Sequence, residues 1–454
     1  MTLEPVHMKE IEEIAVGIDY SFTKRETTDH LEIFKNLSEL KSGGKTLLKS
    51  AGPLFRSKVD ISKISLLEDD FSITYSSDSG STNPIPFESG LFLDICHCAI
   101  AATPTDLDIQ RMRTIVCAGF TPGRSASFQS STDWKYFDDG YGRSKMIQID
   151  SSLLKMRMAR MVHDMAIYAS ESEHILWFQE ELKKEEERDK NIFFMMDGPI
   201  YPKQLMYWMG TDSDDILIRH DPSAQKVLQN YINIMDFHME HEIPVIGFVK
   251  NPAETQVINA LREKIKSEHG FSDLPWATDS QLFKAFLKNP DGKKESAAGV
   301  SGKIGMSGAP GTSPKPDPQK KYLTYTNWFL QPNQFYEKEI KTGSPLIRET
   351  LSHQFEPEDY TLSFFMIYVP FESDGLLFKI ESPYGLIKNE EMRAKITRKM
   401  LYELSGGIIP FTLQKADTVA KIGMDEKKEI KNLFAQETVD RTYNNVRWGD
   451  LDEF

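Results

Sequence analysis

Two aspartates in this chain of 454 residues directly follow apolar runs, and their positions indicate metal chemistry. Asp19 ends the run Ile14-Ala-Val-Gly-Ile, and Asp197 ends the run Ile192-Phe-Phe-Met-Met. A short apolar run that stops at a turn signal is typical of a strand buried on both faces, so we predict a strand at each run. Each aspartate would then lie where a central strand leaves the core of an α/β sheet. Neighbouring carboxylates repel one another unless a cation lies between them, and an all-oxygen site suits Mg²⁺ or Mn²⁺.

Three further polar residues follow or begin predicted elements and could complete such a site. Lys250 ends the apolar segment 244–249, Asp279 begins a predicted helix, and Asp417 lies in the segment 410–420. Hydrolysis of a phosphodiester through bound metals needs several carboxylates to hold the ions, and often a cation beside the phosphate. Because acidic residues are also common turn formers and helix N-caps, each position has a purely structural alternative.

Strands and helices alternate through the middle of the chain, which predicts an α/β core. The expected elements are strands at 71–75, 90–96 and 113–117, a long helix at 151–188, a strand at 192–196, a helix at 222–241, a strand at 243–250, helices at 253–268 and 278–287, strands at 362–369 and 375–381, and helices at 389–404 and 413–422. We divide the chain into the first core strand (1–25), a β-rich insertion (26–148), the core (149–288), a flexible linker or loop rich in Gly, Ser, Pro and Lys (289–321), and the C-terminal part of the core (322–454).

The composition, with 40% hydrophobic and 27% charged residues, is ordinary for a globular protein. No apolar run has the length needed to cross a bilayer and no signal-peptide pattern opens the chain, so we expect a cytoplasmic protein without a membrane partner. The run Cys96-His97-Cys98 lacks the usual spacing of zinc ligands, and we interpret it as ordinary strand residues. The net charge of −14 argues against a basic surface but allows a local basic channel.

The motifs, taken in order, resemble those of the NurA family, archaeal DNA-repair nucleases with an RNase H-like fold. Ile14-Ala-Val-Gly-Ile-Asp19-Tyr-Ser is similar to the family's opening strand, and Phe194-Met-Met-Asp197-Gly-Pro-Ile is similar to its second aspartate strand. The segments 245–250, 278–283 and 406–417 are similar to the family's lysine strand, next acidic motif and closing motif. Two departures stand out: Tyr20 replaces a glycine of the family, and Asp417 stands where the family often has histidine.

The resemblance implies an RNase H-like mixed sheet flanked by helices, with a β-rich insertion after the first strand. It also implies a metal-binding glutamate on the helix before the second aspartate strand, for which Glu171, Glu173 and Glu180 compete. We prefer Glu173 because it lies beside the apolar segment 175–178. The expected ligands of one or two Mn²⁺ or Mg²⁺ ions are Asp19, Glu173, Asp197 and Asp417, with Lys250 beside the scissile phosphate and Asp279 as a further catalytic residue.

The resemblance further implies 5′ to 3′ exonuclease and single-strand endonuclease activity, single- and double-stranded DNA ends as substrates, and a homodimer. The implied partner is a HerA-type hexameric translocase, and the implied process is end resection at DNA double-strand breaks. The departures at Tyr20 and Asp417 leave an alternative, a NurA-like adaptor that binds the translocase without cleaving DNA. A metal-dependent phosphohydrolase of small substrates is disfavoured because the chain has a long basic linker and lacks a nucleotide-binding motif.

Overall fold

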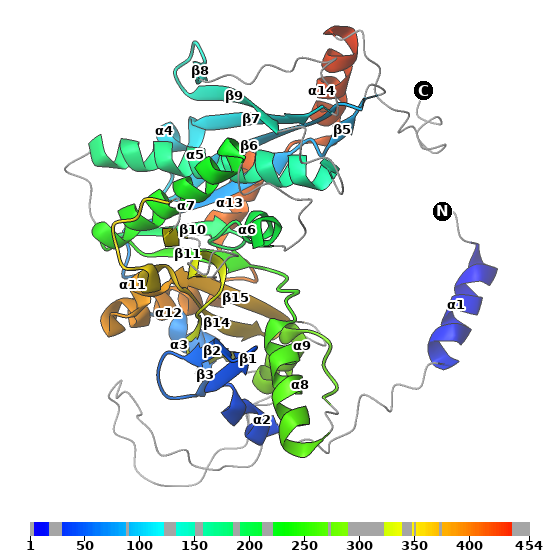
Figure 1. Cartoon of the computed structure of the whole chain (residues 1–454), viewed down its shortest axis with the longest axis vertical. Coiled ribbons are helices and arrows are strands. Elements are labelled where there is room, and N and C mark those ends of the chain that lie inside the picture. Colours follow the sequence, from blue (N-terminus) through cyan, green and yellow to red (C-terminus); the bar gives the residue numbers. More distant parts are fainter. Residues whose placement is uncertain are drawn as a thin grey trace.

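One large mixed sheet, covered by helices on both faces, organises the protein (Figure 1). The computed structural model describes residues 4–17, 30–87, 90–121, 133–149, 158–184, 191–210, 221–270, 274–288, 322–337, 347–348, 351–371 and 375–437. Within these ranges the fold is of the α/β class with a mixed sheet flanked by helices, as the sequence predicts. None of the described helices is long and apolar enough to span a membrane.

The sheet contains 15 strands, and its main path runs in the order β1-β2-β13-β14-β15-β11-β10-β4-β6-β7-β9-β8. The strands are β1 (Glu39–Ser42), β2 (Lys45–Ser50), β3 (Arg56–Asp60), β4 (Ile73–Ser81), β5 (Ile85–Pro86), β6 (Phe92–Thr103), β7 (Arg113–Phe120), β8 (Lys135–Tyr136), β9 (Gly142–Ile149), β10 (Ile192–Asp197), β11 (Val245–Val249), β12 (Tyr322–Thr326), β13 (Phe329–Gln331), β14 (Leu362–Val369) and β15 (Leu376–Pro383). At the centre, β10 is parallel to both β4 and β11, whereas β4, β6 and β7 form an antiparallel series.

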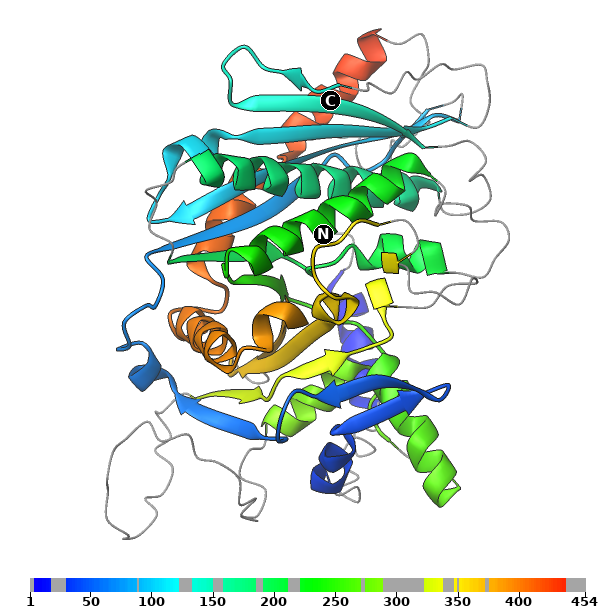
Figure 2. The same cartoon turned by 60° about the vertical axis from the view of Figure 1, so that its left-hand side comes forward.

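The helices lie mainly on the two faces of the sheet. They are α1 (Pro5–Gly17), α2 (His30–Asn36), α3 (Ile61–Ile64), α4 (Leu107–Arg111), α5 (Met158–Lys184), α6 (Lys203–Gly210), α7 (Pro222–Glu240), α8 (Gln256–His269), α9 (Asp279–Lys288), α11 (Tyr384–Ile387), α12 (Glu390–Ser405), α13 (Phe411–Ala420) and α14 (Met424–Glu437), with 3₁₀ turns η4 (Phe335–Glu337) and η5 (Pro357–Tyr360). Figure 2 shows α8 and α9 beside the lower half of the sheet, and α5 and α7 along the upper half.

The central strand β10 is apolar from Ile192 to Met196, and both of its faces are buried there. Phe194 and Met196 belong to the core cluster under α5 and α7, whereas Phe193 and Met195 belong to the cluster under α12 and α13. Side chains alternate between the two faces along a strand, so a strand covered on both sides carries an unbroken apolar run. The prediction of a buried strand at 192–196 is therefore confirmed.

The prediction of a first strand at 14–18 is wrong. Residues Pro5–Gly17 form α1, and none of its residues is buried. The apolar residues of the run are exposed there, Ile14 to 67% and Val16 to 80%. A short apolar run cannot by itself separate a helix segment from a strand, and this one forms a helix instead.

The strands expected within 26–148 exist, but they are not set apart from the central sheet. β4 lies between β10 and β6, so this part of the chain supplies one of the two strands directly beside the second aspartate strand. The predicted helices at 222–241, 253–268, 278–287 and 389–404 correspond to α7, α8, α9 and α12. The linker expected at 289–321 lies outside the described residues, as does Asp19.

Candidate metal centre

The site is built where β4 and β10 run side by side. The two strands are parallel, with Met196 opposite Ser77. The next residue on each strand is an aspartate, Asp197 on β10 and Asp78 on β4. Because adjacent strands lie about 4.8 Å apart, this register brings two carboxylate side chains to neighbouring positions.

Both aspartates lie on the face of the sheet that α13 covers. Phe193 and Met195 pack with Leu413 of α13, and Asp197 continues the same alternation along β10. On β4, a Cβ atom at Gly80 would lie 1.9 Å from the carbonyl oxygen of Ala420 at the end of α13. Glycine at this position therefore lets α13 pack directly against the strand that carries Asp78.

The same helix carries Asp417 toward the aspartate pair. Asp417 is exposed, and its charge is one of those that raise the pKa of Asp78. Burial and the nearby charge of Asp197 are the larger causes, and together they raise the pKa of Asp78 to about 7. A carboxyl group with this pKa holds a proton near neutral pH unless a cation replaces that proton.

Glu171 lies on α5, which covers the opposite face of the sheet, and the charges of Asp78 and Asp197 still reach it. Its carboxyl group is buried and accepts a hydrogen bond from the Tyr231 hydroxyl at 3.2 Å. Burial is the main cause of the rise in the pKa of Glu171 to about 8, and the charges of Asp78 and Asp197 contribute to that rise. A fully buried glutamate that two other carboxylates affect in this way is a candidate metal ligand.

Lys250 lies against Asp197. Its ammonium Nζ is 2.5 Å from Asp197 Oδ2, and the two side chains are 30% and 15% exposed. The turn after Asp197 depends on glycine, because Gly198 has a φ of 110° and a Cβ at Gly247 would lie 2.7 Å from the Gly198 carbonyl oxygen. These glycines allow β10 and β11 to end close together, with Asp197 and Lys250 in contact.

The donor set fits a hard divalent cation. Asp78, Glu171, Asp197 and Asp417 offer only carboxylate oxygens, which Mg²⁺ and Mn²⁺ prefer. In the described part of the chain, they do not form a group of three ligand atoms that all lie within 4.8 Å of one another. Mutual repulsion keeps free carboxylates apart, so the side chains would have to draw together around an ion.

Other predicted site residues have different surroundings. Glu173 forms an ion pair with Arg143 at 3.7 Å and accepts a hydrogen bond from Asn230 Nδ2 at 3.0 Å. Since successive helix residues are about 100° apart, Glu173 points nearly opposite to Glu171. Asp279 accepts hydrogen bonds from the backbone amides of Val257 and Ile258, at 3.2 and 2.8 Å. It therefore caps α8. Glu180 is exposed.

The sequence reasoning did not identify Asp78, and it ranked Glu171 below Glu173. The predicted strand at 71–75 is real, but its continuation carries Ser76, Ser77 and Ser79 and so lacks the apolar run that marks β10. All three serines have buried hydroxyl groups. One sequence signal could have identified Asp78. It is the Asp78-Ser-Gly sequence near the end of β4, a strand that continues into the antiparallel strands β6 and β7.

Half-buried carboxylates on adjacent parallel strands, with a lysine beside one of them, are typical of metal-dependent phosphoryl-transfer enzymes. The family model described as NurA domain matches residues 143–422, more than half of the chain. The chain therefore belongs to the NurA domain family and, with it, to the DNA nucleases. The match includes Glu171, Asp197, Lys250 and Asp417, whereas Asp78 precedes it.

Three solved structures resemble the chain over nearly its full length, at low identity. The NurA nuclease from Sulfolobus solfataricus is 10% identical, with 98% of this chain and 99% of that chain covered and a TM-score of 0.41. NurA with manganese is also 10% identical, with 95% and 98% covered and a TM-score of 0.41. NurA bound to dAMP and manganese is 12% identical, with 96% and 98% covered and a TM-score of 0.32. No curated protein matches the chain. Because these TM-scores are low, the family assignment rests on the domain match.

Proposed function

We propose that this protein hydrolyses DNA phosphodiesters with one or two Mn²⁺ or Mg²⁺ ions held by Asp78, Glu171, Asp197 and Asp417. The observation that carries the proposal is the pairing of Asp78 with Asp197 on adjacent parallel strands, both electrostatically coupled to buried Glu171. Such a pair has little structural use without a cation, since it costs stability through burial and repulsion. The proposal gives Asp78 the role that the sequence predicts for Asp19.

Each residue has a distinct part in the proposed reaction. A bound divalent ion supplies an activated water and stabilises charge on the leaving oxygen. Asp78 and Asp197 hold the ion, and Tyr231 orients the Glu171 carboxyl group through its hydrogen bond. Lys250 offsets negative charge on the phosphate, since its ammonium is already in contact with a proposed ligand, Asp197. Asp417 approaches from the exposed side, where DNA would enter.

The strand arrangement supports an RNase H-like core within the proposal. Three antiparallel strands, β4, β6 and β7, precede α5, and the parallel strands β10 and β11 follow it. The carboxylates then lie on the first strand, the first long helix and the fourth strand of that unit. Residues 26–148 would in this case belong to the core and not to an insertion.

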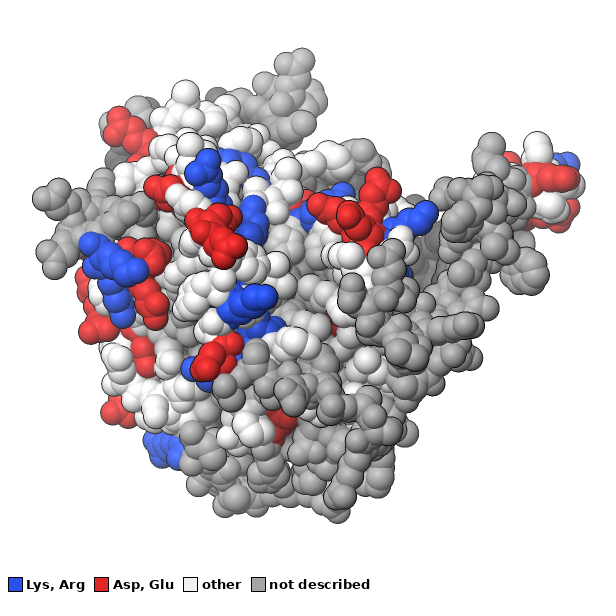
Figure 3. Space-filling model, turned by 90° about the horizontal axis from the view of Figure 1, so that it is seen from above, with Lys and Arg blue, Asp and Glu red and all other residues white. Residues whose placement is uncertain are grey.

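The finer parts of the function rest on family membership. They are 5′ to 3′ exonuclease and single-strand endonuclease activity, a homodimer, a HerA-type translocase as partner in end resection, and a cytoplasmic location. Acidic and basic side chains are interspersed on the face that includes β8 and β9 (Figure 3). This face lacks the continuous positive charge of a DNA track among its described residues, so we expect DNA to bind at a local site near Lys250.

A second candidate function is an adaptor that binds the translocase without cleaving DNA. The observation in its favour is the close ion pair of Lys250 with Asp197, because a lysine can neutralise a carboxylate in place of a metal ion. The raised pKa values of Asp78 and Glu171 fit an adaptor too, if both groups simply stay protonated.

An assay on end-labelled DNA separates these functions. Purified protein is incubated with single- and double-stranded DNA in Mn²⁺, Mg²⁺ or EDTA, with the label at the 5′ or the 3′ end to give the polarity. We expect cleavage that needs the metal and is lost in Asp197→Asn. In Lys250→Ala the cleavage rate should fall far more than DNA affinity, since the lysine acts on the phosphate in the transition state. Absence of cleavage in every metal, while a HerA-type hexamer still binds, would establish the adaptor.

A further inference from the structure

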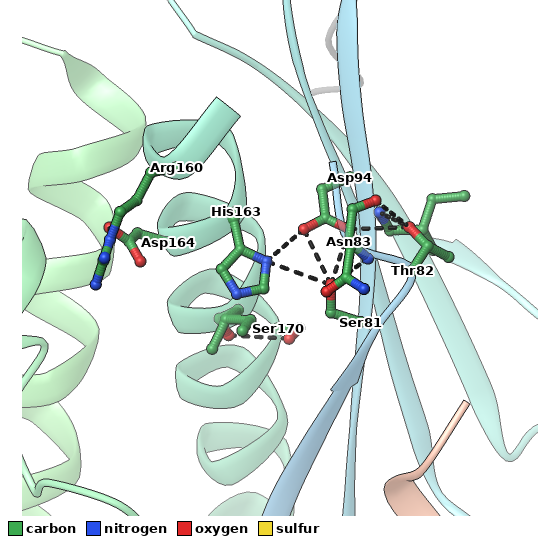
Figure 4. Close-up of polar contacts among 10 residues, drawn as sticks. Ser81, Thr82, Asn83, Asp94, Arg160, His163, Asp164 and Ser170 are labelled. Atoms are coloured by element: carbon green, nitrogen blue, oxygen red, sulfur yellow. Dashed lines mark hydrogen bonds and ion pairs between the residues drawn. The ribbon is translucent and has the colours of Figure 1, made fainter. Parts of the chain in front are cut away.

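A second cluster of potential metal ligands lies between the sheet and α5, separate from the proposed nuclease site. Asp94 and Cys96 on β6 and His163 on α5 each offer one ligand atom, and these three atoms all lie within 4.8 Å of one another. Asp94 and Cys96 are two residues apart on one strand, so both point to the face that α5 covers. Figure 4 shows the His163 ring directed at the Asp94 carboxylate, with Ser81 and Thr82 around it.

Asp94 is a fully buried carboxylate, and no lysine or arginine of the described ranges forms an ion pair with it. Its Oδ2 is 2.6 Å from His163 Nδ1, and its oxygens accept hydrogen bonds from Ser81 Oγ at 3.0 Å and Thr82 Oγ1 at 2.9 Å. Cys96 beside it is fully buried as well. Burial of an ionised carboxylate costs free energy unless a cation compensates, and here only the histidine could supply one.

Of the run Cys96-His97-Cys98, only Cys96 belongs to this cluster. Alternation along β6 puts His97 on the opposite face, where a Cβ at Gly80 would lie 3.2 Å from its Nε2. The three adjacent residues Cys96, His97 and Cys98 therefore cannot bind one metal ion together. This agrees with the sequence analysis, which did not interpret the run as a zinc motif. Cys96 instead meets ligands that are distant in sequence, and spacing alone could not reveal them.

We propose that Asp94, Cys96 and His163 bind a zinc-type divalent cation that joins β6 to α5. A mixed oxygen, sulfur and nitrogen set suits Zn²⁺ or Co²⁺ and not the hard ions of the carboxylate cluster. Ligand atoms of a tetrahedral zinc lie about 3.3 Å apart, so His163 would withdraw slightly from Asp94 on binding. Its side chain is 30% exposed, which leaves room for that movement and a path for the ion.

The place of the cluster gives it a structural role. His163 precedes Glu171 by eight residues on α5, about 12 Å along the helix axis. A metal that fixes α5 to β6 at His163 would hold the helix in register with the sheet, and Glu171 with it. The ion would stabilise the fold and would not take part in cleavage.

Cobalt titration tests the site, because a cobalt–thiolate bond gives a near-ultraviolet charge-transfer band that an all-carboxylate site cannot produce. Full-length protein is titrated with Co²⁺ as the wild type, Cys96→Ser, His163→Ala and Cys117→Ser; Cys117 is the matched control because it lies on β7 with its side chain outside the cluster. Asp197→Asn is titrated as well, to remove cobalt bound at the carboxylate site. We expect the band in the wild type, Cys117→Ser and Asp197→Asn, and its loss in Cys96→Ser and His163→Ala.

Thermal melting with Zn²⁺ gives a second, independent reading. With Asp197→Asn present in every protein to remove binding at the carboxylate site, we expect Zn²⁺ to raise the Tm of the Asp197→Asn protein and of its Cys117→Ser derivative, and to leave the Tm of its His163→Ala derivative unchanged. This variant keeps every buried residue of the cluster, so it remains informative if Cys96→Ser fails to fold. Wild-type protein without the band, together with Asp197→Asn protein without a zinc-dependent rise in Tm, would overturn the proposal, and Asp94 and His163 would then be a hydrogen-bonded pair only. A band that survives in Cys96→Ser would overturn it too.

Discussion

Two carboxyl groups of the proposed site, Asp78 on β4 and Glu171 on α5, hold protons more tightly than ordinary acids, so the stability of the protein and its affinity for metal should depend on pH. Burial, with help from neighbouring carboxylates, raises the pKa of Glu171 to about 8 and that of Asp78 to about 7. Between their ordinary values and these values, the folded protein binds protons that the unfolded chain has released. The free energy of unfolding of the metal-free protein therefore falls as pH rises through this window.

Metal binding should reverse that fall. A cation must displace the protons of Asp78 and Glu171, so its affinity rises with pH. We predict that Mn²⁺ raises the Tm more at pH 8 than at pH 5.5, and that Glu171→Gln reduces the difference. Thermal melts of both proteins at the two pH values, with and without Mn²⁺, measure it. An equal gain in Tm at both pH values would show that the metal does not displace protons from Asp78 and Glu171, and so would contradict their role as ligands.

The two neighbouring glutamates of α5 provide a matched pair of variants. Glu171→Gln should lower metal-dependent cleavage by about a hundredfold or more, since it neutralises a ligand while keeping its size. Glu173→Gln should leave cleavage within a few-fold of wild type and lower stability instead, because Glu173 pairs with Arg143 and Asn230. Cleavage rates and Tm values of the two variants show which glutamate is the ligand. If Glu173→Gln lost cleavage and Glu171→Gln kept it, Glu173 would be the ligand.

Among the elements, the end of α13 lies so close to β4 that no side chain larger than hydrogen fits at Gly80. In Gly80→Ala the added Cβ would meet the Ala420 carbonyl oxygen at 1.9 Å, so α13 must shift and Asp417 with it. We predict a loss of about 1–3 kcal/mol in the free energy of unfolding and slower cleavage. Gly52→Ala is the control, since a Cβ at Gly52 meets nothing within 4 Å. Denaturant unfolding and cleavage assays measure both variants. Equal free energies of unfolding and equal cleavage rates in Gly80→Ala and Gly52→Ala would contradict the prediction.

The elements also show what the sequence could and could not predict. Periodicity located β10, α7, α9, β14 and α12, because their apolar patterns reflect burial against the sheet. It failed at 14–18, where an apolar run forms the exposed helix α1. Periodicity also gave no clear signal for β4, because three of its positions carry serines with buried hydroxyl groups in place of large apolar side chains.

Site residues were harder to predict than elements, because a site depends on contacts between residues that are distant in the sequence. Asp197 and Lys250 follow apolar strands, and the structure brings them into contact. Asp279 also follows a recognisable pattern, but its carboxylate caps α8. Asp78 and the contrast between Glu171 and Glu173 depend on strand order and on helix rotation, which spacing along one sequence does not contain.

At the scale of the whole molecule, the proposed site joins two parts of the chain. The NurA domain match begins at residue 143, yet the strand that carries Asp78 lies in the continuous sheet beside β10. In the proposed site, residues 73–81 would therefore be as necessary as the matched region. The account therefore predicts that the region 143–422 alone lacks one of the two central aspartates and is inactive. Cleavage by that fragment, if it folds, would contradict this.

The most direct test compares the aspartate that the structure selects with the one that the sequence selects. Metal-dependent cleavage of end-labelled DNA is measured for wild type, Asp78→Asn and Asp19→Asn, with metal-free Tm values as a check on folding. We predict that Asp78→Asn loses more than about a hundredfold of the cleavage rate while its Tm is retained or raised, because the change removes a repelled, buried carboxyl group. Asp19→Asn should cleave like the wild type. An inactive Asp19→Asn beside a fully active Asp78→Asn would contradict the account.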